Sequence, residues 1–338
     1  MLALQQRVPL RVENNSKAKR GYGYYRASAL QTYKAKFPNL DKHIDANAAF
    51  KIIARECINH LESNRDIVQN EANIEGVHQM RIALRRLRCA FSLFEKFIKC
   101  EESHLILTEV SWLANKLGKV RDFDVLTTET LPNLRDYSNN HNDILVLSEQ
   151  AIRARQLVCQ AMQEAILSRR YHSLLLTLSS WIENKRWLEQ QHKSGHFKLL
   201  KFAKKSLNSF YKPLMKCKLR FKDMQPKDRH KVRIAAKKLR YAMEFFYNLY
   251  PTKQIDAFII KLAKLQDSLG AMNDMNVTQG LLRPISKTIP STNLNEAIDI
   301  SERWIRKKIN QECSKADSAL KNLLKVKPFW IDLETPQT

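Results

Sequence analysis

The sequence is poor in the residues that interrupt helices. Its 338 residues include only seven glycines and ten prolines. Because glycine and proline are the residues least favourable in a helix interior, their scarcity favours helices over sheets. No run of about 18 apolar residues is present, so we expect no membrane insertion.

Cysteines are few and scattered, and none forms a CxxC pair. A disulfide framework or a zinc site would need paired or regular spacing. The N-terminal residues also lack the apolar core of a signal peptide, since Arg7, Pro9, Arg11 and Glu13 interrupt it. We therefore expect a cytoplasmic protein with no metal site and with reduced thiols at six positions: Cys57, Cys89, Cys100, Cys159, Cys217 and Cys313.

Acidic residues are strongly outnumbered. The chain has 34 Asp and Glu against 58 Lys and Arg, which gives a formal net charge of +24. Apolar residues make up 44% of the sequence, which is ordinary for a globular protein, so the charge lies on a chain that can fold. Such an excess indicates an anionic partner: nucleic acid, an acidic membrane surface or polyphosphate. Composition does not choose among these.

Patterning divides the chain into a basic extension, a helical body and a short tail. Residues 1–45 mix basic residues with tyrosines, which is typical either of a solvated extension partly docked on the body or of an aid to nucleic-acid binding. From residue 46 apolar residues recur at helical spacing. We expect the body over 46–330, a break between its halves at Lys193-Ser194-Gly195, and a tail over 331–338.

The body contains an internal repeat. VHQMRIALRRLRCAFSLFEKF (77–97) and RHKVRIAAKKLRYAMEFFYNL (229–249) share eight of 21 residues at an offset of 152. The same offset aligns LGKVRDFDV with LGAMNDMNV. One offset over about 75 residues predicts two copies of one helical unit, repeat one over about 46–190 and repeat two over about 196–330. Two such copies usually pack about a pseudo-two-fold axis, which would bring the two motif helices together.

Each motif places a basic row opposite an apolar stripe when residues advance by 100°. The rows are His78, Arg81, Arg85 and Arg88 in the first copy, and His230, Arg233, Lys237 and Arg240 in the second. The stripes are Met80, Ala83, Leu84, Leu87, Ala90, Phe91 and Phe94, and Val232, Ala235, Ala236, Leu239, Ala242, Met243 and Phe246. Arg86 and Lys238 lie on a flank, and Tyr241 falls on the basic side.

Each row is about 15 Å long and contains no acidic residue. Like charges at these spacings are unfavourable in an isolated helix, so their duplication indicates an anionic ligand. Arginine suits phosphate oxygens through its planar fork, and lysine acts as a point charge. The alternative is a solvated basic face.

The expected helix starts add a second argument. Gly76 and Asp228 are acceptable N-cap residues that would place His78 and His230 in the first turn, where free N–H groups favour an anion. The helix dipole would lower the histidine pKa and a bound phosphate would raise it. If the phosphate dominates, binding should strengthen as the pH falls toward about 6. The alternative is a histidine that caps or packs.

Asp122 and Asp274 each follow a Leu-Gly pair, and a helix N-cap is the simplest interpretation of both. A salt bridge to nearby arginines is the next, and a divalent-metal site is disfavoured because no cluster of carboxylates surrounds them. The sequence has no Walker-type loop, HExxH or GxSxG. We therefore expect neither enzyme activity nor a cofactor.

At VHQMRIALRRLR and RHKVRIAAKKLRY the chain resembles the CHAD family, the conserved-histidine α-helical domains. LGKVRDFDV, LGAMNDMNV and Lys327-Pro328-Phe329-Trp330 resemble further family segments, and the resemblance covers about 46–330. It implies an all-α fold of two similar four-helix-bundle repeats around a basic central groove or channel. It also implies non-enzymatic binding of inorganic polyphosphate by His78, Arg81, Arg85, Arg86, Arg88, His230, Arg233, Lys237, Lys238 and Arg240.

We add Tyr241 to these candidates because it lies on the basic side. Many relatives carry a CYTH triphosphatase domain, but no ExExK motif occurs here, so the chain looks like a stand-alone binder, with polyphosphate granules as one expected location. The alternative is an RNA- or DNA-binding protein that uses the same basic surface. The sequence does not indicate an oligomeric state.

Overall fold

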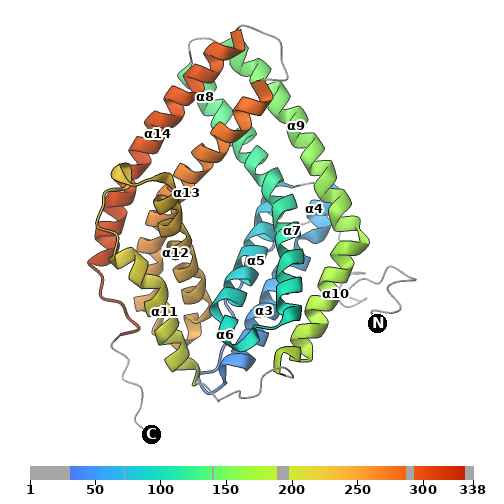
Figure 1. Ribbon diagram of the computed structural model, residues 1–338, viewed down its shortest axis with the longest axis vertical. Helices are drawn as coiled ribbons and strands as arrows, with labels where there is room; N and C mark the ends of the chain where they lie inside the picture. Colours follow the sequence, from blue (N-terminus) through green and yellow to red (C-terminus); the bar gives the residue numbers. More distant parts are fainter. Residues whose placement is uncertain (1–30, 72, 139–140, 189–197, 287–292, 332–338) are drawn as a thin grey trace. The chain divides into compact units, whose positions relative to one another are not determined.

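The computed structural model describes residues 31–71, 73–138, 141–188, 198–286 and 293–331 (Figure 1). Within these ranges the regular structure is helical, and the only pairing of β type is an isolated bridge between Asp45 and Lys198. The all-α prediction is therefore confirmed. None of the described helices is long and apolar enough to cross a membrane. No disulfide joins any of the six cysteines, all of which lie within the described ranges.

The chain forms two compact units that are not contiguous in sequence. Unit 1 comprises residues 1–121 and 157–199, and unit 2 comprises 122–156 and 200–338. Residues 122–156, which fall within the first predicted repeat, thus pack with the second half of the chain. The repeat boundaries, the pseudo-two-fold axis and the basic groove stay predictions, and the expected break at Lys193-Ser194-Gly195 lies outside the described residues.

Unit 1 is built around an aromatic cluster. The ring of Phe50 lies 5.2–6.0 Å from those of Phe91, Phe94, Trp181 and Trp187. The Trp187 indole also donates to the side chain of Asn47 at 3.0 Å, which satisfies its buried N–H. The helices of this unit are α3 (Ala46–Ser63), α4 (Arg65–Glu71), α5 (Ile74–Leu93), α6 (Glu95–Ile98), most of α7 (Glu101–Val125), the end of α9 (His141–Leu167), α10 (Arg169–Glu183) and the 3-10 turn η2 (Arg186–Leu188).

Residues 31–45 belong to unit 1. Asn64 on α3's C-terminal side accepts from the Tyr33 amide and donates to the Tyr33 carbonyl, both at 2.9 Å. Leu40 is 4% exposed. The Asp45 carboxylate then caps α3 by accepting from the Ala48 amide. This part of the predicted extension is therefore docked, and the basic residues and tyrosines before residue 31 lie outside the described residues.

Unit 2 has an aromatic cluster of the same kind. The ring of Phe258 lies 5.1–6.0 Å from those of Tyr211, Phe329 and Trp330, and the Trp330 indole donates to Asn208. In each unit, therefore, a tryptophan near its C-terminal end is hydrogen-bonded to an asparagine. The elements of unit 2 are the π-turn η1 (Leu126–Thr130), α8 (Leu131–Tyr137), the start of α9, α11 (Leu199–Met215), η3 (Phe221–Asp223), α12 (Pro226–Phe245), η4 (Tyr247–Leu249), α13 (Thr252–Ser286) and α14 (Asn293–Leu324).

Helices α13 and α14 lie side by side in unit 2 (Figure 1). Leu282, Ile285 and Trp304 from this pair share one apolar cluster with Leu131 and Leu147. Residues 122–156 therefore belong to unit 2 because their apolar side chains are buried there. The buried Asp124 carboxylate adds an ion pair with Arg155, whose Nε lies 2.7 Å away.

The Leu-Gly pairs do not break a helix, which corrects the interpretation of Asp122 and Asp274 as N-caps. Gly118 and Asp122 lie inside α7, and Gly270 and Asp274 lie inside α13. Both aspartates are half-buried, and Asp274 accepts from the Asn273 side chain at 3.3 Å. A single helix-interior glycine costs only about 1 kcal/mol relative to alanine, which the packing of a long helix readily offsets.

Candidate functional site

Helix α5 presents the first basic row, and the apolar stripe predicted for it is buried. Every residue of the stripe is at most 2% exposed, from Met80 at 0% to Phe91 at 2%. The helix packs on α3, and its start is capped by the Asn73 side chain, which accepts from the Gly76 amide at 2.9 Å. Burial of the stripe fixes the rotation of α5 about its axis and turns the row away from the core.

Helix α12 presents the second basic row in the same manner. Its predicted stripe is buried throughout, with Ala235 the most exposed member at 8%. Pro226 begins the helix, a position where the missing N–H costs nothing. The amphipathic assignment of both motifs is therefore confirmed.

Both helices begin earlier than the sequence suggested, which corrects the N-cap assignments. The residue before α5 is Asn73 and the residue before α12 is Gln225, in place of Gly76 and Asp228. His78 and His230 are consequently the fifth residues of their helices, beyond the first turn in which backbone N–H groups are free. The argument for an anion held by the helix N-terminus therefore fails for both histidines.

In unit 1 the half-buried His78 lies among cations. Desolvation lowers its pKa, and the nearby guanidinium groups of Arg121, Arg85 and Arg81 lower it further, while the Glu75 carboxylate opposes them. Burial is the largest cause of this shift, and the added contribution of three guanidinium groups indicates a positive potential at His78. A bound phosphate would reverse that effect by favouring the imidazolium.

Arg81 is held by the neighbouring helix. Its Nη1 donates to the Gly118 carbonyl of α7 at 2.8 Å. A Cβ atom at residue 118 would lie 3.0 Å from the same nitrogen, so glycine at this position allows the approach. The contact fixes one edge of the guanidinium. By contrast, Arg85 and Arg88 form no hydrogen bond or ion pair with any described residue, and Arg88 is exposed.

Arg86 departs from the prediction that it binds the ligand. It is fully buried, at 0% exposure, and its Nη2 donates to the Lys36 carbonyl at 2.9 Å. The flank of α5 that carries Arg86 is covered by the docked residues 31–45, which the helical angles could not reveal. Arg86 is therefore an internal group of unit 1, and its charge contributes to lowering the pKa of the buried His60.

The second row differs from the first in exposure and in charge. His230 is exposed, and Arg233 and Lys237 are half-buried. Arg240 forms an ion pair with Glu244 at 3.4 Å, one turn along α12. The α12 row contains no acidic residue, as predicted, but Glu244 outside the row offsets part of its charge. The residue of the first copy that aligns with Glu244 is Ser92, which leaves Arg88 without such a partner.

Two further candidate ligands on α12 are shielded from solvent: Tyr241 is buried and Lys238 is half-buried. Tyr241 is only 4% exposed, with the Arg240 guanidinium 5.3 Å from its ring centroid. It therefore lies within the fold, contrary to its predicted place on an open basic side. Lys238 is half-buried, and its ammonium lies 5.7 Å from the ring of Phe210.

Sequence reasoning overlooked Arg121 and Glu244. Arg121 stands in the Leu-Gly-x-x-Arg-Asp segment on α7, and only the packing of α7 beside α5 reveals that it adds a cation near His78. A signal for Glu244 was present, because a glutamate four residues after an arginine is well placed to pair with it on a helix.

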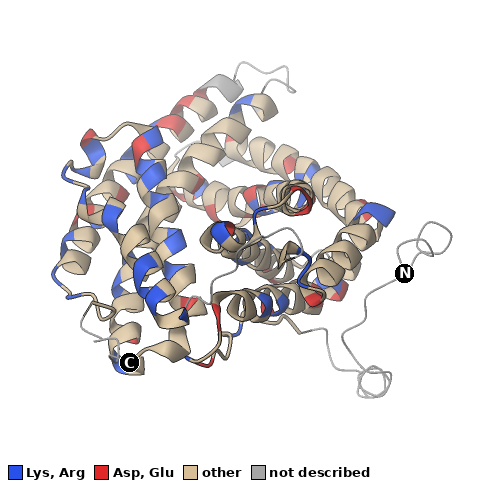
Figure 2. Ribbon diagram, turned by 60° about the horizontal axis from the view of Figure 1, so that its bottom comes forward, with Lys and Arg blue, Asp and Glu red and all other residues tan. Residues whose placement is uncertain are grey.

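Lys and Arg extend well beyond the two rows. Figure 2 shows them on helices of both units, in keeping with their excess over Asp and Glu in the sequence.

Comparison with known proteins gives the family. The model of the CHAD domain matches residues 52–283. The crystal structure of the CHAD domain from the plant Ricinus communis is 30% identical, with a TM-score of 0.75 over 88% of this chain and 98% of that one. PptA from Streptomyces chartreusis has a TM-score of 0.62 over 82% and 99% of the two chains, and its 12% identity indicates a shared fold alone. No curated protein matches. On the family match and the plant structure, the chain belongs to the CHAD family.

Proposed function

We propose that the chain binds inorganic polyphosphate, without catalysis, through the α5 row (His78, Arg81, Arg85 and Arg88) and the α12 row (His230, Arg233, Lys237 and Arg240). The observation that carries the proposal is the duplication of one arrangement. Each row stands on a helix whose opposite stripe is buried, so the same four positions point away from the core in both units. Membership of the CHAD family adds support.

The chemistry of the rows suits a linear phosphate polymer. Successive row positions are three or four residues apart, which places their cations about 5–6 Å apart along the helix. Arginine forks can bind two phosphate oxygens at once, and charge-assisted bonds of this kind are stronger than neutral ones. Apart from His78 and His230, the rows contain no aromatic side chain for base stacking, which favours polyphosphate over single-stranded RNA.

We refine the set of proposed ligands from burial and charge. Arg86 and Tyr241 leave it because they are buried, and Arg121 enters it because its charge acts on His78. Lys238 stays at the edge of the α12 row, since it is half-buried against Phe210. Arg85 is the strongest single candidate, because no described residue occupies its donors.

The test is a paired charge reversal, Arg85→Glu with Lys237→Glu, in the full chain. Long-chain polyphosphate, RNA and DNA of equal charge are titrated at fixed ionic strength. We expect polyphosphate affinity to fall by about thirtyfold to nine-hundredfold, since each of the two reversals replaces a favourable contact by a repulsive one and costs about 1–2 kcal/mol. Circular dichroism should stay helical, because both side chains lie outside the buried stripes.

The matched control is Lys96→Glu with Lys253→Glu, which changes the net charge equally at exposed lysines, one in each unit. The control should reduce affinity only a few-fold. If both double variants weaken binding equally, the rows are not the site. If the unchanged protein binds all three polymers equally well, it is a general polyanion binder and the polyphosphate proposal fails.

A further inference from the structure

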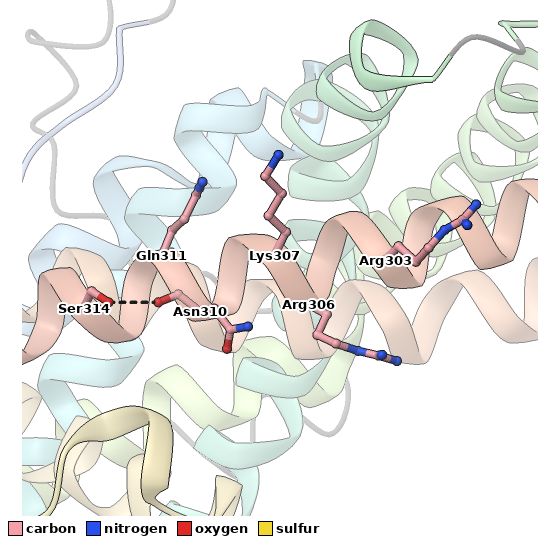
Figure 3. A pocket seen from close by; sticks show the side chains of 6 residues that line it. All are labelled: Arg303, Arg306, Lys307, Asn310, Gln311 and Ser314. Carbon is pink, nitrogen blue, oxygen red and sulfur yellow. Dashed lines mark hydrogen bonds between the residues drawn. The ribbon is translucent and has the colours of Figure 1, made fainter.

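Helix α14 carries a third basic face, which the motif analysis did not include. It lies beyond residue 283, the last residue that the family model matches. A pocket of about 550 Å³ runs along it, within unit 2 (Figure 3). We call this surface the α14 face, and its lining residues are Arg303, Arg306, Lys307, Asn310, Gln311 and Ser314.

The α14 face is an organised side of the helix. Its six residues follow helical spacing over about 16 Å, and all are exposed. The opposite side is held in the core of unit 2, where Trp304, Ile305, Cys313 and Ala316 are each at most 5% exposed. The face therefore has a fixed direction, and its side chains can meet a ligand without any rearrangement of the helix.

The cations of the α14 face are crowded and poorly compensated. The run Arg303 to Lys308 holds four cations and no acid. The nearest carboxylate before it, Glu302, is engaged mainly by Arg283 at 2.8 Å, and that guanidinium is the main reason its pKa is lowered. Arg306 also lowers this pKa, so Glu302 offsets part of the charge of one of the four cations. Arg303 makes no hydrogen bond or ion pair with any described residue. Repulsion among these groups is relieved when an anion binds between them.

Positions along the face favour a ligand with several oxygens in a row. Lys307 is steadied by the Tyr137 ring, 5.4 Å from its ammonium. Figure 3 shows Lys307 and Gln311 pointing to one side of the helix and Arg306 and Asn310 to the other. Ser314 already donates to the Asn310 carbonyl. The side chains thus offer guanidinium, ammonium and amide donors and no carboxylate, along an open surface of the helix.

We propose that the α14 face is a second anion-binding site of unit 2, which takes a run of about three phosphate groups from a linear oligophosphate. The choice of ligand class rests on the proposed function. The site itself does not depend on the α5 and α12 rows, because none of its residues belongs to them.

The experiment uses the full chain carrying Arg85→Gln and Lys237→Gln, which weakens the rows, and sodium tripolyphosphate as the probe in calorimetric titrations. This background should keep one saturable site. Adding Arg303→Gln, Arg306→Gln and Lys307→Gln should weaken it at least tenfold. The matched control adds Lys253→Gln, Lys321→Gln and Lys325→Gln, which remove the same charge from exposed lysines elsewhere in unit 2, and should change affinity less than twofold.

Equal weakening by the two sets of substitutions would overturn the proposal, because net charge alone would then account for binding. A background protein with no saturable site would overturn it as well. Failure of the proposed function looks different: the background protein would bind long-chain polyphosphate as tightly as the unchanged protein, whatever the α14 substitutions do.

Discussion

Replacement by alanine should change the free energy of unfolding differently at the two aligned glycines, Gly118 and Gly270. Both lie inside long helices, where alanine is favoured over glycine by about 1 kcal/mol. Nothing lies within 4 Å of a Cβ atom at residue 270, so Gly270→Ala should raise the free energy of unfolding by about 1 kcal/mol.

At residue 118 a second effect opposes that gain. The new Cβ would lie 3.0 Å from Nη1 of Arg81, which donates to the Gly118 carbonyl at 2.8 Å. The guanidinium must withdraw by a few tenths of an ångström and lose part of a charged hydrogen bond worth about 1.5–3 kcal/mol. We therefore expect Gly118→Ala to leave stability unchanged or to lower it by about 1 kcal/mol, at least about 1 kcal/mol worse than Gly270→Ala.

Urea unfolding followed by circular dichroism measures both variants, and a double-mutant cycle isolates the cause. In an Arg81→Ala background the steric conflict is gone, so Gly118→Ala should become stabilising by about 1 kcal/mol, as at residue 270. Equal stabilisation by the two alanines in the unchanged background would refute the reasoning, since Arg81 would then not depend on the absence of a Cβ at residue 118.

Three further predictions follow from burial and charge. Arg86→Ala should lower the free energy of unfolding by about 3 kcal/mol, because it leaves a cavity at a fully buried site and removes the donor to the Lys36 carbonyl. Lys238→Ala, at the aligned position, should lower it by less than about 1 kcal/mol. Thermal denaturation that gives the two variants equal stability would contradict this. Asp124→Asn should cost about 2–4 kcal/mol in the same assay, because it leaves the partly buried Arg155 without its anion, against under about 0.5 kcal/mol for an exposed aspartate. Because the pKa of His78 is lowered in the folded protein, the free energy of unfolding should decrease as the pH falls below about 6.5. A bound phosphate would raise that pKa, so polyphosphate affinity should increase as the pH falls over the same interval. If His78→Gln keeps the full pH dependence in titrations, another group is responsible for it.

The sequence by itself determined the helical class, the two motif helices and the stripes that they bury. These features depend on the 3.6-residue period, which is a property of neighbouring residues along one helix. Every residue of both predicted stripes is buried for that reason. The repeat of the motif likewise required only an alignment of the chain with itself.

Tertiary structure decided what happens beside the stripes. Arg86 and Lys238 occupy aligned positions on the helix flank, yet only Arg86 is fully buried, because residues 31–45 cover it in unit 1. The charge of Arg121 acts on His78 only because α7 packs beside α5. Residues 122–156 belong to unit 2 because their apolar side chains contact residues distant in the sequence. The angle of a residue on its helix is local, but what covers that angle depends on segments far along the chain, and periodicity carries no information about them.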